Sequence, residues 1–178
     1  MIERLKSKIR EIKDFPKPGI GFKDIMPLVR DAESFAYVID AIAAWAERKE
    51  PELIVGIESR GFLFAAPVAH RLALGAAAIR KKGKLPGPTV SVRAPNEYAV
   101  EHFEMQADAV RPGQRVVIID DLIATGSSSI SAIDVVGKLE GRVAGFAAVV
   151  ELEFLHGVEA IRRAHPGVEV FSLVKYTE

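Results

Sequence analysis

Short runs of consecutive apolar residues alternate along this chain with segments whose apolar positions recur at helical spacing. The runs predict strands, and because they are continuously apolar they predict a sheet covered on both faces. The predicted strands are residues 53–57, 76–81, 115–120, 145–152 and 168–174. The predicted helices lie at about 34–49, 62–74, 127–139 and 155–164. This alternation predicts an α/β fold, a doubly wound and mostly parallel sheet with flanking helices.

Two segments fall outside this alternation. In the first, Leu5, Ile9 and Ile12 lie at i, i+4 and i+7, which predicts an amphipathic helix that ends before Pro16. Its single apolar edge favours packing on the core or on a dimer partner over binding to a membrane. The second segment, residues 83–106, is longer than a usual connection and only weakly periodic. We expect it to be a lid or binding loop rather than a disordered linker.

The composition restricts the classes of protein to which the chain can belong. Its 178 residues suffice for one domain with a sizeable core, which we place at residues 1–178. The 24 Lys and Arg residues balance the 24 Asp and Glu residues, so no basic excess predicts nucleic acid as a partner. No apolar run approaches the roughly 20 residues of a membrane span. There is also no cysteine for disulfides, which is compatible with a reducing compartment. From these features together we expect a soluble, cytoplasmic protein whose partners are small molecules.

Ligands of a doubly wound sheet bind outside the carboxyl ends of its strands. The strand 115–120 ends on Asp120, which Asp121 follows directly. Two carboxylates at a strand-to-loop transition can accept hydrogen bonds from sugar hydroxyls or orient water on a divalent ion, the alternative being a capping or turn-forming pair. Because neighbouring side chains of a strand point to opposite faces, we do not expect the two carboxyl groups to share a proton.

Small and hydroxyl-bearing residues follow the two acids. Residues 124–129 precede a segment in which Ile130, Ile133 and Val136 have helical spacing, so they lie at a helix N-terminus. Free backbone N–H groups and the positive end of the helix dipole bind anions there, and Gly126 permits close approach. The segment predicts a phosphate site, the alternative being an ordinary N-cap by one serine. Neither the Walker motif nor the dinucleotide fingerprint is present.

This order of strand, acids and Thr-Gly-Ser loop resembles the signature of the phosphoribosyltransferases. Stretches along nearly the whole chain are similar, more specifically, to the adenine phosphoribosyltransferase family. They read DFPKPGIGFKDIMPLV (14–29), GIESRGFLFAAPVA (56–69), IRKKGKLPGPT (79–89), EYAVEHFEMQADAVRPGQRVVIIDDLIATG (97–126) and VVELEFLHG (149–157). The resemblance implies the type I phosphoribosyltransferase fold and a homodimer. It also implies a purine salvage reaction, in which adenine and phosphoribosyl pyrophosphate give AMP and pyrophosphate.

The resemblance further implies a role for each part of the site. The 5-phosphate would bind to Ala124, Thr125, Gly126, Ser127 and Ser128, and the ribose would lie against Asp120 and Asp121. Pyrophosphate would be bound by Glu58, Ser59, Arg60, Arg80 and Lys84, with a cis peptide between Glu58 and Ser59. Arg80 would reach a neighbouring subunit's site. Mg²⁺ would be carried by the substrate, with no metal site made by protein residues alone.

Glu97 and Tyr98 match the family's catalytic pair within the lid. Glu97 would handle a proton at N7 of the purine, and Tyr98 would help to close the lid and exclude water. The base would bind at Ile20, Gly21, Phe22 and Lys23, in a hood formed by residues 1–33. Leu152 would be either an apolar wall under the base or ordinary core.

The chain also departs from the family's pattern. Gly21 and Lys23 stand in place of a larger apolar residue and an Arg, Ser127 and Ser128 in place of Gly and Thr, and Ala99 in place of Gly. A Cβ at Ser127 is tolerated only if its φ is negative. Because Lys lacks the planar fork of Arg, a 6-oxopurine stays an alternative to adenine. A non-catalytic regulator that binds phosphoribosyl pyrophosphate is the alternative to an enzyme.

Overall fold

The computed structural model describes residues 1–19, 21–94 and 102–178. Its elements are α1 (Ile2–Ser7), β1 (Arg10–Ile12), β2 (Phe22–Asp24), α2 (Met26–Arg30), α3 (Ala32–Glu47), β3 (Leu53–Ile57), α4 (Phe62–Arg71), β4 (Gly75–Lys81), β5 (Thr89–Arg93), β6 (His102–Gln106), β7 (Arg115–Ile123), α5 (Ser127–Lys138), β8 (Arg142–Leu152), a 3₁₀ turn η1 (Glu153–Leu155), α6 (Gly157–Ala164) and β9 (Glu169–Tyr176). None of the helices in these described ranges combines the length and apolar character that crossing a bilayer requires.

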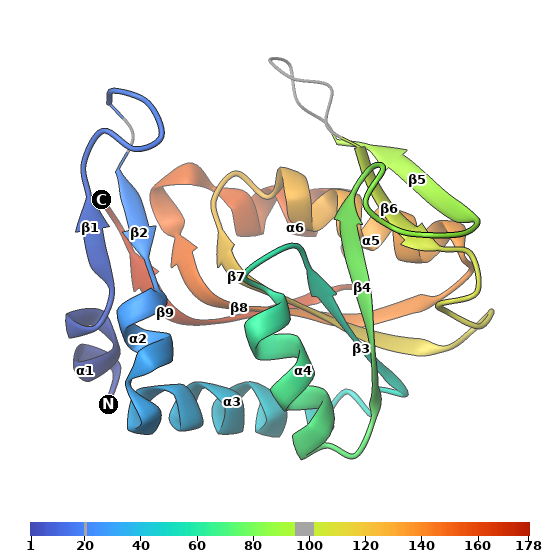
Figure 1. The fold of residues 1–178 in the computed structure, drawn as a ribbon, viewed down its shortest axis with the longest axis horizontal. Coiled ribbons are helices and arrows are strands. Elements are labelled where there is room, and N and C mark those ends of the chain that lie inside the picture. Colours follow the sequence, from blue (N-terminus) through green and yellow to red (C-terminus); the bar gives the residue numbers. More distant parts are fainter. Residues whose placement is uncertain (20, 95–101) are drawn as a thin grey trace.

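A seven-stranded sheet forms the centre of the domain, in the order β5-β6-β4-β3-β7-β8-β9 (Figure 1). The five strands from β4 to β9 in this order run parallel. In the described part of this sheet, the antiparallel pairs are those of β6, with β4 on one side and β5 on the other. The predicted parallel sheet and its four flanking helices are confirmed as β3, β4, β7, β8, β9 and α3 to α6.

The two faces of the sheet bury two separate apolar clusters. Ile54 of β3 and Val117 of β7 pack in the cluster that contains α3 and α4. Their neighbours Val55 and Ile118 pack in the cluster that contains α5 and α6. Since successive side chains of a strand point to opposite faces, both sets are buried only if both faces are covered. Because helices cover both faces of the sheet, the sequences of these strands are continuously apolar.

The N-terminal segment does not form the single helix that its spacing predicts. The helix α1 ends at Ser7, and β1 then pairs antiparallel with β2, placing Ile12 opposite Phe22. Leu5 and Ile9 are nonetheless buried in the cluster with α3 and α4, as predicted for core packing. The prediction was wrong beyond Ser7 because pairing with β2, a distant segment, outweighs local helical spacing.

The segment 83–106 is also more regular than its sequence suggested. Its two ends are the strands β5 and β6, which extend the central sheet. Each strand has period-two apolar positions, Val90 and Val92 in β5 and Phe103 and Met105 in β6, a signal that the prolines before them obscured. The lid stays a prediction, because residues 95–101 lie outside the described residues.

Gly145 gives a test of the packing between α3 and β8. Trp45 of α3 stacks on Phe171 of β9, with ring centroids 5.2 Å apart, and a Cβ at Gly145 would lie 2.5 Å from Trp45 Cη2. We expect Gly145→Ala to lower the free energy of unfolding by about 1–3 kcal/mol, because the ring cannot move without leaving its stack. Urea unfolding measures this change.

Gly137→Ala is the matched control. Gly137 lies within α5, and a Cβ there would have no heavy atom within 4 Å among the described residues. The same substitution should be neutral or stabilising by about 0.5–1 kcal/mol, because alanine favours the helix. Equal losses at both positions would show that the contact with Trp45 is not the cause.

Candidate active site

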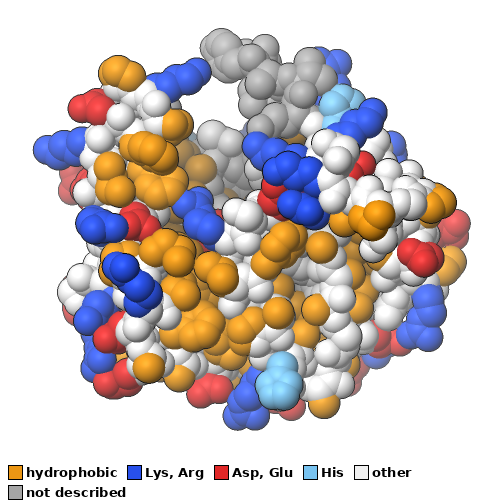
Figure 2. Space-filling model, in the orientation of Figure 1, with side chains coloured by type: hydrophobic (Ala, Val, Ile, Leu, Met, Phe, Trp, Pro, Cys, Tyr) orange, Lys and Arg blue, Asp and Glu red, His pale blue; other side chains and the backbone are white. Residues whose placement is uncertain are grey.

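A cavity of about 530 Å³ opens at the carboxyl ends of β3, β4 and β7. Around it, Figure 2 shows Lys and Arg side chains gathered beside acidic ones in the upper half of the viewed face. The lining includes most of the residues predicted to bind the sugar phosphate, together with a few neighbours: Ile57, Glu58, Ser59, Arg60, Lys81, Lys84, Phe103, Asp120, Asp121, Leu122 and residues 124–129. The parallel sheet therefore brings three distant chain segments to one place, as the fold predicted.

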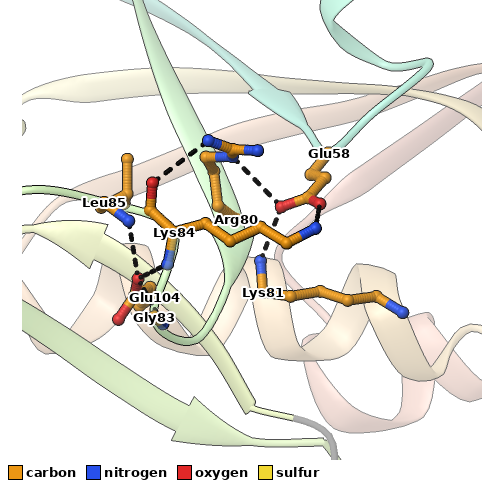
Figure 3. A network of polar contacts seen from close by, with 7 residues as sticks. All are labelled: Glu58, Arg80, Lys81, Gly83, Lys84, Leu85 and Glu104. Carbon is orange, nitrogen blue, oxygen red and sulfur yellow. Dashed lines mark hydrogen bonds and ion pairs between the residues drawn. The ribbon is translucent and has the colours of Figure 1, made fainter.

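Glu58, directly after β3, contacts the cationic side chains at the end of the neighbouring strand β4 (Figure 3). Its buried carboxylate accepts the backbone N–H of Lys81 at 3.0 Å, lies 3.2 Å from Arg80 Nε and contacts Lys84 Nζ. Burial alone would raise the pKa of Glu58, but the hydrogen bonds from Lys84 and Lys81 and the nearby positive charges bring it below its ordinary value. Glu58 is thus a charged carboxylate. The peptide between Glu58 and Ser59 is cis, as the resemblance implied.

Arg60 connects the sugar site to the N-terminal hood. Its Nε lies 2.7 Å from Asp121 Oδ2, and its guanidinium carbon lies 4.8 Å from the centre of the Phe22 ring. Both contacts are favourable for a cation, one with a carboxylate and one with an aromatic face. A single side chain therefore spans from β7 to β2.

Asp120 and Asp121 differ from their predicted placement. The strand β7 continues to Ile123, so both aspartates lie within it and both are buried. Asp120 Oδ1 accepts the backbone N–H of Asp121 at 2.8 Å, which turns this carboxyl group back along the strand toward its neighbour. The two carboxyl groups affect each other's pKa although their positions alternate, and the prediction that they do not share a proton stays a prediction.

Burial dominates the titration of this pair. It raises the pKa of Asp120 well above the ordinary value, and the negative charge of Asp121 raises it further. Burial also raises the pKa of Asp121, although the positive charge of Arg60 opposes this effect. Burial is therefore the main cause of the raised pKa of both aspartates, and Asp121 is the one that is paired with Arg60.

The loop after β7 has the form that anion binding requires. Gly126 occupies the N-cap of α5 with a φ of 85°, and Ser127 is the first helical residue. The left-handed conformation therefore falls on the glycine, and the Cβ of Ser127 is tolerated. No side chain caps this helix among the described residues, so the alternative of an ordinary serine N-cap is not observed. Ser127 and Ser128 line the cavity, so the first turn of α5, where backbone N–H groups and the helix dipole favour an anion, lies at its edge.

Gly157 supports this loop from behind, a role that the sequence analysis missed. A Cβ at Gly126 would lie 2.6 Å from the carbonyl oxygen of Gly157, and a Cβ at Gly157 would lie 2.2 Å from that of Ala124. Both positions must therefore lack a side chain for α6 to approach the loop. Local spacing gives no signal of this contact, because it joins segments about thirty residues apart.

Gly21, Phe22 and Lys23, three of the predicted base-binding residues, lie in the N-terminal segment, and Leu152 lies at the end of β8; none of these four lines the cavity. Lys23 is nearly buried, with its Nζ 3.4 Å from Glu11 Oε2 and 4.3 Å from the centre of the Tyr176 ring. Gly21 lies beside the same glutamate, because a Cβ there would be 3.2 Å from Glu11 Oε1. Leu152 is buried in the core cluster of α3 and α4. Among these residues only Phe22 has a contact with the cavity, through Arg60.

Ile20, Glu97, Tyr98 and Ala99 lie outside the described residues. Within the described ranges, no three His, Cys, Asp or Glu side chains are grouped as a metal site would require. The described part of the site thus combines a helix N-terminus for an anion, two buried aspartates, and three cations held by carboxylates. This combination suits a ligand with a phosphate at one end, hydroxyl groups in the middle and further negative charge at the other.

Comparison with known proteins identifies sequences and structures of the same kind along the whole chain. Residues 28–174 match the phosphoribosyl transferase domain family. The adenine phosphoribosyltransferase of Desulfitobacterium hafniense is 48% identical over 94% of this chain and 95% of its own length. That of Acidobacterium capsulatum is 46% identical over 99% of this chain and 95% of its own length.

Solved structures agree with these sequence relatives. The adenine phosphoribosyltransferase of Thermoanaerobacter pseudethanolicus is 44% identical and superposes with a TM-score of 0.92, covering 99% of this chain and 100% of that one. The Saccharomyces cerevisiae enzyme, complexed with adenine and an imino-altritol bisphosphate, is 37% identical with a TM-score of 0.88, covering 97% and 98%.

Asp120→Asn should raise the temperature of thermal unfolding, and the gain should grow with pH. The pKa of Asp120 in the folded protein exceeds its ordinary value of 3.8, so the protonated carboxyl group stabilises the fold. This contribution is fully present below pH 3.8 and is lost as pH rises through the folded-state pKa. Asn keeps the Oδ1 acceptor but cannot ionise. We expect a gain of roughly 2–6 °C at about pH 8, equivalent to about 1–2 kcal/mol, and little gain at about pH 4.

Calorimetry across this pH range measures the effect. Asp108→Asn, at an exposed position, is the control for loss of one negative charge. If the two variants shift the unfolding temperature equally at every pH, burial of Asp120 is not the source of the effect.

Proposed function

Because the chain belongs to the phosphoribosyl transferase family, we propose that it is an adenine phosphoribosyltransferase that converts adenine and phosphoribosyl pyrophosphate to AMP and pyrophosphate in purine salvage. The observation that carries this conclusion is the identity of 46–48% with adenine phosphoribosyltransferases over nearly the whole chain. The alternatives of a 6-oxopurine substrate and of a non-catalytic regulator are not favoured, because the relatives named above are all adenine phosphoribosyltransferases.

We assign the site residues to the parts of the substrate as follows. The loop 124–128 binds the 5-phosphate, supported by its position at the N-terminus of α5. Asp120 and Asp121 receive the ribose hydroxyls, and pyrophosphate binds at residues 58–60 with Arg80 and Lys84. The contacts of these cations with Glu58 and Asp121 support the last assignment, since side chains already directed at carboxylate oxygens are suited to phosphate oxygens.

The transfer breaks the bond from C1′ to pyrophosphate as N9 of adenine bonds to C1′. Positive charge builds on the ribose and negative charge leaves with pyrophosphate, so cations beside the leaving group stabilise the transition state. Arg60, Arg80 and Lys84 perform this role once they exchange their carboxylates for the substrate. We propose that Glu97 accepts the proton lost from N7 and that Tyr98 closes the site, both in the connection between β5 and β6.

Mg²⁺ is expected to arrive with phosphoribosyl pyrophosphate. Asp121 Oδ2 is a buried oxygen that lies 2.7 Å from Arg60 Nε, and carboxylate oxygens are ligands that Mg²⁺ prefers. This supports the two aspartates as the groups that orient the ion's water ligands. Bound Mg²⁺ neutralises charge on the leaving pyrophosphate.

The division of the domain and its assembly also belong to this proposal. We expect residues 1–33 to act as the hood over the base, with Ile20, Gly21, Phe22, Lys23 and Leu152 around it, and a lid to lie within residues 83–106. A cytoplasmic homodimer is expected, and the broad apolar area over α2 to α4 in Figure 2 supports the dimer. Met26 of α2 and Leu63 of α4 are exposed apolar residues of these helices. Arg80 contacts Glu58 of its own chain here, and its reach into a partner's site stays a prediction.

Side-by-side assays with radiolabelled adenine, hypoxanthine and guanine test the function. With phosphoribosyl pyrophosphate and Mg²⁺, we expect AMP from adenine with an efficiency at least about 100-fold above that of the 6-oxopurines, because their donor and acceptor patterns at positions 1 and 6 are exchanged. A chelator should abolish the product. Nucleotide from no purine, despite binding of the sugar phosphate, would contradict the enzyme assignment.

Glu97→Gln tests the acid-base role. Gln keeps the size of the side chain but cannot take up a proton, so we expect kcat to fall roughly 10²–10⁴-fold. The affinity for phosphoribosyl pyrophosphate, measured by calorimetry, should change little. Glu47→Gln, an exposed position on α3, is the control. Unchanged turnover in Glu97→Gln would remove this residue from the mechanism.

A further inference from the structure

Glu104 is a buried acid that the assignments above do not use. It lies in the middle of β6, opposite Arg80 of β4, and only 3% of it is exposed. Its Oε1 accepts the backbone N–H groups of Gly83, Lys84 and Leu85 at 2.9, 3.1 and 3.1 Å. Its Oε2 accepts the hydroxyl of Thr89 at 3.2 Å. Such a carboxylate is surrounded by donors on both oxygens.

These donors keep the carboxylate charged. Burial would raise the pKa of Glu104, but the hydrogen bonds from the three backbone N–H groups and from Thr89 outweigh it, and the pKa is lowered. Three successive N–H groups directed at one anion define the conformation of a turn, as in backbone anion sites. Here the anion is part of the protein, so the turn 83–85 is fixed from inside the fold.

The turn carries one of the expected pyrophosphate cations (Figure 3). The carbonyl oxygen of Lys84 accepts a hydrogen bond from Arg80 Nη1 at 3.1 Å, while its N–H is held by Glu104. The side chains of Lys84 and Arg80 then converge on Glu58. The backbone of Lys84 is therefore held on both sides, and its placement also affects the guanidinium of Arg80.

We propose that Glu104 is a positioning residue for pyrophosphate recognition, which fixes the turn 83–85 so that Lys84 and Arg80 are held together at the cavity. This inference rests on the proposed function, which assigns pyrophosphate to these two cations. Glu104 acts only through the turn: its hydrogen bonds are to backbone N–H groups and to Thr89, and it does not line the cavity. Its loss should therefore weaken binding of the pyrophosphate group and spare the steps that involve the base.

A graded set of variants tests this role. Glu104→Leu removes all acceptors, Glu104→Gln keeps one carbonyl oxygen for the N–H groups without the charge, and Thr89→Val removes only one donor. We expect the KM for phosphoribosyl pyrophosphate to rise up to about 100-fold in Glu104→Leu, roughly tenfold in Glu104→Gln and about twofold in Thr89→Val. The kcat at saturating substrate and the KM for adenine should stay close to those of the unaltered protein.

Calorimetry with inorganic pyrophosphate and Mg²⁺ gives a second readout that needs no catalysis. The affinity for pyrophosphate should fall in the same order as the KM rises. This measurement separates the two proposals: a chain that makes no AMP, yet binds pyrophosphate more weakly in Glu104→Gln, contradicts the proposed function and supports the positioning role.

Glu52→Gln is the matched control. Glu52 also accepts a backbone N–H, that of Arg115 at 2.9 Å, but at the start of β7, the opposite end of the strand from the cavity. The Glu52→Gln variant should leave the KM for phosphoribosyl pyrophosphate and the affinity for pyrophosphate unchanged. The positioning role is overturned if a folded Glu104→Gln binds pyrophosphate as the unaltered protein does, or if kcat and both KM values change together. If Glu104→Leu does not fold, the Gln and Val variants decide by the same criteria.

Discussion

Three carboxyl groups with little exposure to water, those of Glu58, Asp120 and Asp121, line one cavity at the carboxyl ends of β3 and β7, and the cost of shielding their negative charge from water determines how the surrounding cations are arranged. The three carboxyl groups are compensated in different ways. Glu58 is compensated by Arg80, Lys84 and a backbone N–H, and Asp121 by Arg60. Asp120 has no ion pair with the described residues, and its pKa is raised by burial and by the charge of Asp121. The cations that we assign to the phosphorylated substrate, Arg60, Arg80 and Lys84, are thus paired with carboxylates of the same cavity.

This arrangement has a consequence for binding. Under the proposed assignment, a pyrophosphate group would compete with Glu58 and Asp121 for the same cations, so its affinity would be the difference between two sets of charge-assisted hydrogen bonds. The cations, however, need little reorganisation, because their backbones are held in place. The turn 83–85 is held by Glu104, and the loop after β7 is held by the contact between Gly126 and Gly157. Because these backbone segments are fixed, the cationic side chains can exchange a carboxylate for a phosphate without moving out of position.

The hood is coupled to this charged centre through one aromatic ring. Phe22 lies against Arg60, whose other contact is Asp121, so the region expected to bind the base and the region expected to bind the sugar share a side chain. The hood itself is anchored by Leu5 and Ile9 in the core and by Lys23, which lies between Glu11 and Tyr176. The replacement of Arg by Lys at position 23 is accommodated here as a cation on an aromatic face, a contact that does not require the planar fork.

By itself, the sequence determined the alternation of strands and helices, the buried strand before Asp120 and Asp121, and the loop 124–128, because apolar periodicity and helix-terminal residues act over a few neighbouring positions. It also indicated Glu58 to Arg60 and Arg80 to Lys84 as strand-end chemistry. Tertiary structure alone decided that β1 replaces the second half of the predicted helix and that β5 and β6 extend the sheet. It likewise decided the contacts of Glu104, Gly157 and Tyr176. Each of these depends on a partner distant in the chain, and hydrogen bonds or close packing between distant segments leave no local pattern in the sequence.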